Sequence, residues 1–380
     1  MPTVSDELPE KPDVAPPERL TSIDALRGFD MFWIVGGDQV ARALCKWLGT
    51  TEAQRLGDQF EHVDWEGFRF YDLIFPLFLF LVGVVLPFSL RKYMTADHPK
   101  RVALGRTARR VVLLFLLGLI YNNLLQFHFD QLRVTGVLQR IAICYGIASL
   151  IFLFTSVRTQ VILFVAILAG YWAILMYVPA PESKTAGDLT IQTNLAGYLD
   201  RHYLPGRIYK SYYGFGDNEG LLSTIPAVAT TLLGVLAGHW LLSGRNRWIK
   251  ALGLAFAGLA CLGLGIVWSR EFPIIKILWT SSYVLVAGGW SLLLLSLFYT
   301  IIDVIKLRAW AFVFVVIGVN AITIYIAKDI IPFDEISRYF LGGVARYSGS
   351  FRPAVVPIGT LAFEWLFLFH LYRNRIFLRV

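Results

Sequence analysis

Cysteine, charge and the motifs of common soluble enzymes are all scarce in this chain of 380 residues. The three cysteines, Cys45, Cys144 and Cys261, are widely spaced and odd in number, so the sequence predicts neither a disulfide framework nor a zinc site. Asp, Glu, Lys and Arg together make up only 16% of the residues. No P-loop, GxSxG or HExxH pattern occurs, which excludes the usual signatures of NTPases and hydrolases.

Long apolar segments dominate the sequence instead. Hydrophobic residues make up 56% of the chain and the mean hydropathy is +0.58, which is more than a soluble domain normally carries. Segments of about 20 apolar residues are long enough to cross a bilayer as helices. We therefore predict an all-α polytopic membrane protein with about ten transmembrane helices, at residues 23–44, 70–90, 111–127, 134–156, 160–179, 221–242, 249–268, 277–301, 309–332 and 354–372.

The chain ends and the loop charges predict the orientation. Residues 1–18 are polar and rich in Pro and Glu, so we expect a disordered tail before one membrane domain at 19–380. Seven Lys or Arg lie in the loop 91–110, and more follow the sixth and tenth predicted helices. The positive-inside rule places these loops and both termini in the cytoplasm. Orientation therefore explains the net charge of +8 better than nucleic-acid binding does.

The first predicted helix carries charge within an apolar sequence, at Asp24, Arg27, Asp30 and Asp38. Charge inside a membrane span is usually kept for function. On a regular helix Asp24, Arg27 and Asp38 share a stripe about 60° wide, because each residue advances by about 100°. A purely structural Asp24–Arg27 ion pair explains two of them equally well. Asp38 lacks such an explanation, since its nearest cation in sequence is Arg42.

A single histidine precedes the second predicted helix. His62 lies in a loop that we expect at the external membrane face, where Asp38 also lies. Histidine has an ordinary pKa of about 6.5 and is the usual general base. A lone histidine in a loop is as often merely solvated, and the residues alone leave both interpretations open.

Further charges lie in or near the predicted helices, at Asp72, Arg140, Asp329 and Glu364. Arg140 follows Arg133 by seven residues, which in a helix places both on nearly the same face. A guanidinium suits phosphate or carboxylate, either on a ligand or on a buried residue of another helix. The sequence does not choose between these two roles.

Seven motifs lie along the chain in a fixed order: RLTSIDALRGFD at 19–30, His62 with DWEG at 64–67, DLIFPLFLFLVG at 72–83, GVLQR at 136–140, GDNEGLLSTIPA at 216–227, LWTSSY at 278–283 and GVNAITIY at 318–325. Several of them are polar, and apolar helices do not imitate polar motifs by chance. In this order they resemble the heparan-alpha-glucosaminide N-acetyltransferase family and its bacterial relatives. The resemblance covers residues 19–330 and extends toward the C-terminus.

The resemblance implies a membrane enzyme that takes acetyl from cytosolic acetyl-CoA, its co-substrate, without a metal. The acceptor would be the amino group of a glucosamine-type sugar across a bacterial inner membrane. His62 matches the family's catalytic histidine, and Asp38 stands where the family has an Asn. An ionised carboxylate cannot donate to an oxyanion as an amide can, so this departure puts the role of Asp38 in question. Further candidate pocket residues are Asp24, Arg27, Asp72, Arg140, Glu219 and Asn320.

A transporter of a sugar or related solute is the main alternative function. Transporters often contain paired repeats and broken helices, and the sequence has no visible internal repeat. A structural or partner-binding membrane protein is a third class. The sequence leaves open the natural acceptor, the formation of a homodimer, and the choice between direct transfer and an acetyl-histidine relay.

Overall fold

The computed structural model describes residues 20–94, 99–209 and 214–378, and its regular elements are helices. Within those ranges the only strand-like pairings are two isolated bridges, Glu66 with Ile275 and Arg133 with Gly206. The predicted all-α fold is therefore confirmed. The tail predicted at residues 1–18 lies outside the described residues.

The α-helices of the described chain are α1 Thr21–Phe32, α2 Asp38–Leu48, α3 Thr51–Asp58, α4 Ile74–Leu90, α5 Lys100–Tyr121, α6 Val137–Phe154, α7 Val157–Tyr177, α8 Leu195–Tyr203, α9 Thr224–Leu241, α10 Arg247–Trp268, α11 Ser281–Tyr299, α12 Phe312–Val319, α13 Ala321–Ile330, α14 Phe333–Tyr347 and α15 Arg352–Arg373. Within the described ranges, seven helical segments are long and apolar enough to cross a membrane. The pair α12–α13, bent by 64°, is an eighth candidate. The protein is thus a polytopic membrane protein, as predicted.

Two of the ten predicted spans do not lie among these eight candidates. The segment predicted at 23–44 is divided between α1 and α2. The segment predicted at 111–127 belongs to α5, which begins at Lys100 and carries its Lys and Arg in its first half. Every predicted span therefore overlaps at least one helix of the structure. The number of membrane crossings stays a prediction.

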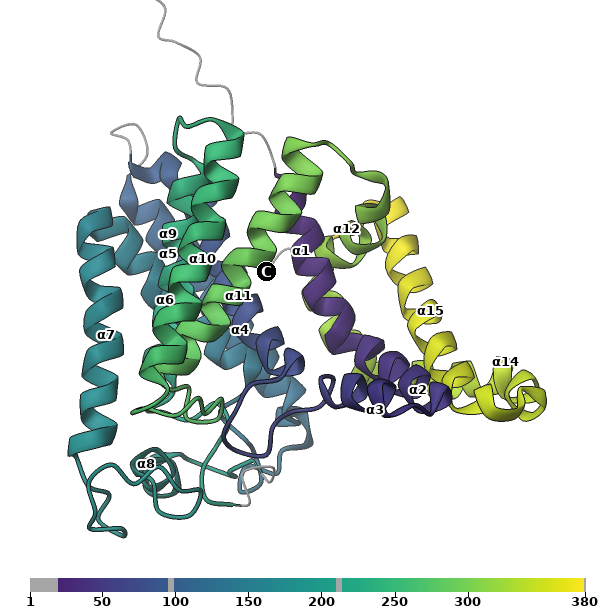
Figure 1. Cartoon of the computed structure of the whole chain (residues 1–380), viewed down its shortest axis with the longest axis horizontal. Coiled ribbons are helices and arrows are strands. Elements are labelled where there is room, and N and C mark those ends of the chain that lie inside the picture. Colours follow the sequence, from purple (N-terminus) through teal and green to yellow (C-terminus); the bar gives the residue numbers. More distant parts are fainter. Residues whose placement is uncertain (1–19, 95–98, 210–213, 379–380) are drawn as a thin grey trace, which may run out of the picture.

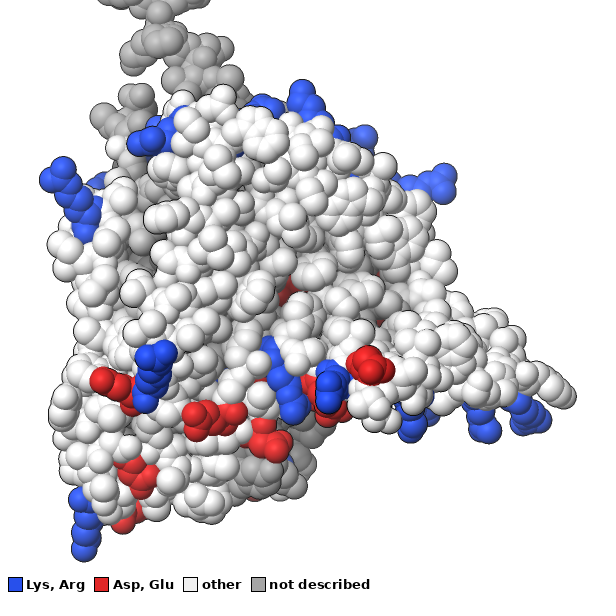
Figure 2. All heavy atoms as spheres, in the orientation of Figure 1, with Lys and Arg blue, Asp and Glu red and all other residues white. Residues whose placement is uncertain are grey.

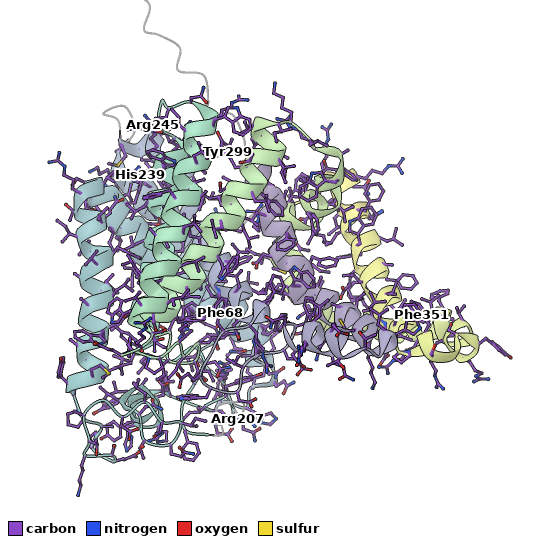
Figure 3. The ribbon with its side chains drawn as sticks, in the orientation of Figure 1. Phe68, Arg207, His239, Arg245, Tyr299 and Phe351 are labelled. Atoms are coloured by element: carbon purple, nitrogen blue, oxygen red, sulfur yellow. The ribbon has the colours of Figure 1, made fainter. Side chains whose placement is uncertain are left out.

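The bundle has two ends, which are seen in Figure 1 and which differ in charge in Figure 2. The basic end carries residues 242–246 and 305–311, and Arg245, His239 and Tyr299 lie toward it in Figure 3. The loop end carries α8 and the segments 59–69, 178–194 and 269–280. Lys and Arg rim the basic end in Figure 2, whereas Asp and Glu gather toward the loop end. This polarity agrees with a cytoplasmic basic end, and the orientation itself stays a prediction.

Helix α1 crosses α12 at backbone contact through two glycines. A Cβ atom at Gly28 would lie 1.7 Å from the carbonyl oxygen of Phe314, and one at Gly318 would lie 2.0 Å from that of Asp24. Only glycine permits this approach. Arg27 Nε donates to the Gly318 carbonyl at 2.6 Å, which fastens the first sequence motif to the last.

Helix α1 ends in a short π-helical segment, Trp33–Gly37, before α2 begins. Gly36 in this segment has a φ of 144°, a conformation that other residues rarely adopt. The Nζ of Lys328 donates to the Ile34 carbonyl at 3.1 Å and so satisfies one backbone group at the break. The predicted regular helix through 23–44 is therefore wrong, because the break moves Asp38 onto a separate helix and removes the predicted stripe.

Candidate active site

His62 lies at the loop end against Asp72, which sits just before α4. The His62 Nδ1 is 2.8 Å from Oδ1 of Asp72. Asp72 is fully buried, and its Oδ2 also accepts the backbone N–H groups of Val63 at 3.4 Å and Arg69 at 3.0 Å. The Asp72 carboxylate thus positions both the 62–69 loop and the imidazole ring of His62. With Nδ1 donating to Asp72, the lone pair of the neutral ring lies on Nε2.

Lys276 brings a cation to the same ring from the segment before α11. Its Nζ lies 2.8 Å from His62 Nδ1, 3.3 Å from Nε2 and 3.3 Å from Asp72 Oδ1. The Tyr71 ring lies beside the imidazole, with 4.7 Å between the ring centroids. The His62 side chain is still 52% exposed, so it can meet a substrate. The sequence analysis missed Lys276, whose only signal is a lone Lys in the apolar run FPIIKILW.

The surroundings of His62 favour its neutral form. Burial lowers the pKa of His62 below its ordinary value and the charge of Lys276 lowers it further, while the hydrogen bond and charge of Asp72 oppose them. A neutral imidazole is the form that accepts a proton. Burial also lowers the pKa of Lys276, against the opposing charge of Asp72.

A cavity of about 180 Å³, the His62 cavity, opens beside this cluster. Six of the seven sequence motifs contribute to it, which explains why polar residues far apart in the chain are needed together. Its walls combine polar groups with apolar and aromatic side chains, as small-molecule sites generally do. The lining residues are Ile34, His62, Tyr71, Ile74, Phe75, Val137, Asn218, Glu219, Lys276, Ile277, Trp279 and Tyr325.

Arg133 holds the GDNEG motif at this cavity. Its Nε and Nη2 lie 2.9 and 2.6 Å from the two carboxylate oxygens of Asp217, and Nη2 also contacts Glu219. Burial would raise the pKa of Asp217, but the Arg133 guanidinium holds it below its ordinary value. Since α6 begins at Val137, the predicted helix face shared by Arg133 and Arg140 is wrong.

Arg140 lies buried behind the same motif, with 1% of its surface exposed. Its Nη2 donates to Ser223 Oγ at 2.5 Å and to the Gly220 carbonyl at 3.4 Å. The guanidinium lies 4.9 Å from the ring centroid of Trp279, a wall of the His62 cavity. Among the described residues, its Nε and Nη1 have no hydrogen-bond partner. Neutral groups therefore hold Arg140 in this part of the chain, and an ion pair with a buried carboxylate, one of the two alternatives that the sequence left open, is not found there.

Asp38 pairs with Arg42 and not with His62. The Asp38 Oδ2 lies 2.8 Å from Arg42 Nη2, and Asp38 is buried. Asp72 occupies the position beside the ring that an orienting residue requires. Asp38 reaches His62 only through its charge, which favours the protonated ring. A catalytic role for Asp38 stays a prediction.

A second cavity, of about 310 Å³, lies in the half of the bundle toward the basic end. Arg27 and Arg110 line this basic-end cavity. Arg27 Nη2 also lies 2.8 Å from Asp24 Oδ1, which confirms the predicted ion pair. Asn320 stands at the bend between α12 and α13, where its Nδ2 donates to the Ile376 carbonyl at 3.3 Å.

The two cavities follow one another along the same three helices. The paired lining residues are Phe78 and Phe75 of α4, Ile141 and Val137 of α6, and Ile322 and Tyr325 of α13. The members of each pair are three or four positions apart, which is about one helical turn or roughly 5 Å. A thin layer of side chains therefore separates the basic-end cavity from the His62 cavity.

Apart from Asp38, the predicted site residues fall into two groups. His62, Asp72 and Glu219 meet at the His62 cavity, and Arg140 lies behind its Trp279 wall. The second group is found at or beside the basic-end cavity and consists of Asp24, Arg27 and Asn320.

Comparisons with known proteins agree with the motif order. The profile of a family described as a domain of unknown function, DUF5009, matches residues 19–131. Heparan-alpha-glucosaminide N-acetyltransferase of Homo sapiens is 28% identical over 375 residues, which cover 83% of this chain and 53% of that protein. The protein of the same name from Mus musculus is 27% identical over 327 residues, which cover 72% of this chain and 49% of that protein. The chain spans about half the length of these curated relatives, and the predicted resemblance is confirmed.

Proposed function

We propose that this protein is a membrane-embedded acetyltransferase. It moves acetyl from cytosolic acetyl-CoA to the amino group of a glucosamine-type sugar on the opposite side of a bacterial inner membrane. The observation that carries this proposal is the pair of cavities about one helical turn apart, with His62 in the cavity at the loop end. The similarity to two proteins named as N-acetyltransferases supports the same class of reaction.

The basic-end cavity suits the donor substrate. Arg27 and Arg110 line it, and guanidinium groups favour the phosphates of a nucleotide. The pantetheine arm of acetyl-CoA is narrow and largely uncharged, so movement of one layer of side chains is enough to admit it. The thioester then reaches His62 where an acceptor arrives from the loop end, and both reactants are held in one place.

In the proposed reaction the acceptor nitrogen attacks the thioester carbon while His62 Nε2 takes a proton from the amine. Asp72 orients the ring and stabilises the imidazolium through Nδ1, the arrangement that a general base commonly needs. The Lys276 ammonium is close enough to stabilise the developing oxyanion. Breaking the carbon–sulfur bond releases the CoA thiolate, which receives the proton, so the enzyme ends unchanged.

A filter assay with labelled acetyl-CoA and a panel of amino sugars tests the function in vesicles. The parent protein should transfer label to a glucosamine-type acceptor. His62→Ala should lower turnover by roughly 10²–10⁴-fold, the usual contribution of a general base, while acetyl-CoA binding persists. His128→Ala is the matched control, because His128 is an exposed histidine that lines neither cavity. Near-normal turnover in a folded His62→Ala protein contradicts the mechanism.

The same assay separates direct transfer from a covalent relay. Direct transfer requires a ternary complex, so double-reciprocal plots at several acceptor concentrations should intersect. Parallel plots, or acetyl label trapped on His62 when the acceptor is withheld, would instead establish the relay.

One observation favours transport as a second candidate function. The break between α12 and α13 at Asn320 and the break at Gly36 resemble the discontinuous helices of transporters. Uptake of labelled glucosamine into vesicles without acetyl-CoA would support this alternative. Acetylated glucosamine that forms only with acetyl-CoA and stays on the acceptor side of the vesicle would support the acetyltransferase.

A further inference from the structure

A third cavity, of about 630 Å³, lies beside the His62 cavity. The two cavities share Ile34 as a lining residue. They also share α13, which presents Tyr325 to the His62 cavity and Lys328 and Asp329 about one turn later to the third cavity. We call this space the α13–α15 cavity, because α13, α14 and α15 supply most of its walls.

Glu364 of α15 gives this cavity a buried polar group that needs a partner. Only 3% of its surface is exposed, and its Oε2 has no hydrogen-bond partner in the described part of the chain. Lys328, which also lines the cavity, donates from Nζ to the Ile34 carbonyl at 3.1 Å. Gly36 faces the carboxyl group, because a Cβ built at that position would lie 4.0 Å from Oε2, so the break between α1 and α2 brings backbone without a side chain to this group. A buried polar atom without a partner is unfavourable, and a ligand hydroxyl would satisfy it.

The charges of the lining describe the ligand. Cations and anions balance, and Arg338 and Asp334 pair with each other at 3.2 Å. A strongly anionic or cationic ligand would meet as much repulsion as attraction here. A neutral polyhydroxylated ligand can donate to the carboxylates and accept from the cations, since each hydroxyl does both. The ionisable lining residues are Lys328, Asp329, Asp334, Arg338, Arg352 and Glu364.

We propose that the α13–α15 cavity binds a second, neutral sugar of the acceptor, linked to the amino sugar that reacts at His62. The volume lies within the range of roughly 300–1,000 Å³ that is typical of small-ligand sites. The inference rests on the proposed acetyltransferase function and deepens it. The acceptor is a glycan end with at least two sugars, and neither free glucosamine nor a sulfated chain is the preferred substrate.

Initial rates with two acceptors test this site: glucosamine, and a β-linked disaccharide with glucosamine at its non-reducing end and N-acetylglucosamine at the other. The parent should show a KM for the disaccharide about tenfold below that for glucosamine, equivalent to about 1.4 kcal/mol of binding. Glu364→Leu should remove this difference and leave glucosamine kinetics within about twofold, since the second sugar alone reaches Glu364. If the Glu364→Leu variant does not fold, Glu364→Gln takes its place in the same measurements. The control is Glu335→Leu, an exposed residue of α14 outside the cavity.

Equal KM values for both acceptors in the parent, or equal changes for both in the Glu364 variants, overturn the inference. A sulfated disaccharide that binds more tightly than the neutral one overturns it as well. Calorimetric titration with N,N′-diacetylated disaccharide, without acetyl-CoA, separates this inference from the proposed function. Binding that is lost in Glu364→Leu supports the sugar site even if no acetyl transfer is found, whereas transfer without such binding supports the reaction alone.

Discussion

The protonation state of His62 depends on the two charged residues that touch it. Burial and Lys276 lower its pKa, and Asp72 opposes them. The base is lost when His62 is protonated, so kcat/KM should fall as the pH drops through the lowered pKa. Lys276→Met removes a cation that disfavours imidazolium, so the acid limb should move to higher pH. Asp72→Asn removes an anion, so the limb should move to lower pH.

Profiles of kcat/KM against pH check both signs. Lys276→Arg is the control because it retains the charge and should leave the limb near that of the parent. Asp72→Asn should also lower kcat by roughly 10²–10⁴-fold, since it weakens the orientation of the ring. Shifts of the same sign in Lys276→Met and Asp72→Asn would contradict this account of the site.

At Asp38 the resemblance predicts an Asn instead of an Asp. Its carboxylate pairs with Arg42, and Asp72 holds the place beside His62, so we propose contact with the acceptor amine as the role of Asp38. Asp38→Asn should then keep measurable activity, because an amide oxygen still accepts from an amine. Asp38→Leu should abolish activity. Activity assays of the folded variants test this role. If Asp38→Leu has the same turnover as the parent protein, Asp38 is purely structural.

Among the elements, the crossing of α1 and α12 is the contact that tolerates substitution least. A Cβ at Gly28 meets a backbone oxygen at 1.7 Å, and backbone cannot move aside as a flexible side chain does. Gly28→Ala should therefore cost about 3 kcal/mol or more in unfolding free energy, at the upper end for overpacking. Thermal unfolding in detergent measures this loss. Gly105→Ala in α5 is the control, because its Cβ has nothing within 4 Å; equal stability of the two variants would contradict the packing argument.

The helices of the predicted spans could be recognised from the sequence, but their breaks and the helices α3, α8 and α14 between the spans could not. Apolar length alone located every predicted span on a helix, because crossing a bilayer demands such length. The break at Gly36 depends on tertiary contacts, such as Lys328 bonding to the Ile34 carbonyl from far along the chain. Periodicity assumes a regular helix, so it could not show that Asp38 leaves the stripe of Asp24.

Over the whole molecule, the orientation of the two ends decides which compartment supplies the donor. We expect Glu52→Cys in α3 to react with an impermeant maleimide added outside sealed cells, and Gly244→Cys at the basic end to react only after permeabilisation. Both positions are exposed, and both variants are made in a chain whose three native cysteines are replaced. Labelling of Gly244→Cys from outside would reverse the orientation and remove the cytosolic source of acetyl-CoA.

Only part of the site could be predicted from the sequence. Polar motifs in apolar surroundings pointed to His62 and Asp72, which the fold joins at 2.8 Å. Lys276 lies more than 200 residues further along the chain, in an apolar run without any local pattern. Only the fold brings it to His62, so a single sequence could not reveal that pairing.

The thin layer between the basic-end cavity and the His62 cavity also has an electrical consequence. If water fills both cavities while no substrate is bound, most of the membrane voltage falls across roughly 5 Å of side chains. Each elementary charge crossing that layer at 100 mV then exchanges about 2.3 kcal/mol with the membrane potential. The acetyl thioester carries no charge, so its passage costs no such energy, whereas a leak of protons through the same layer would discharge the membrane. If the proposed reaction is correct, we therefore expect the layer to act as an insulator that admits a neutral chain.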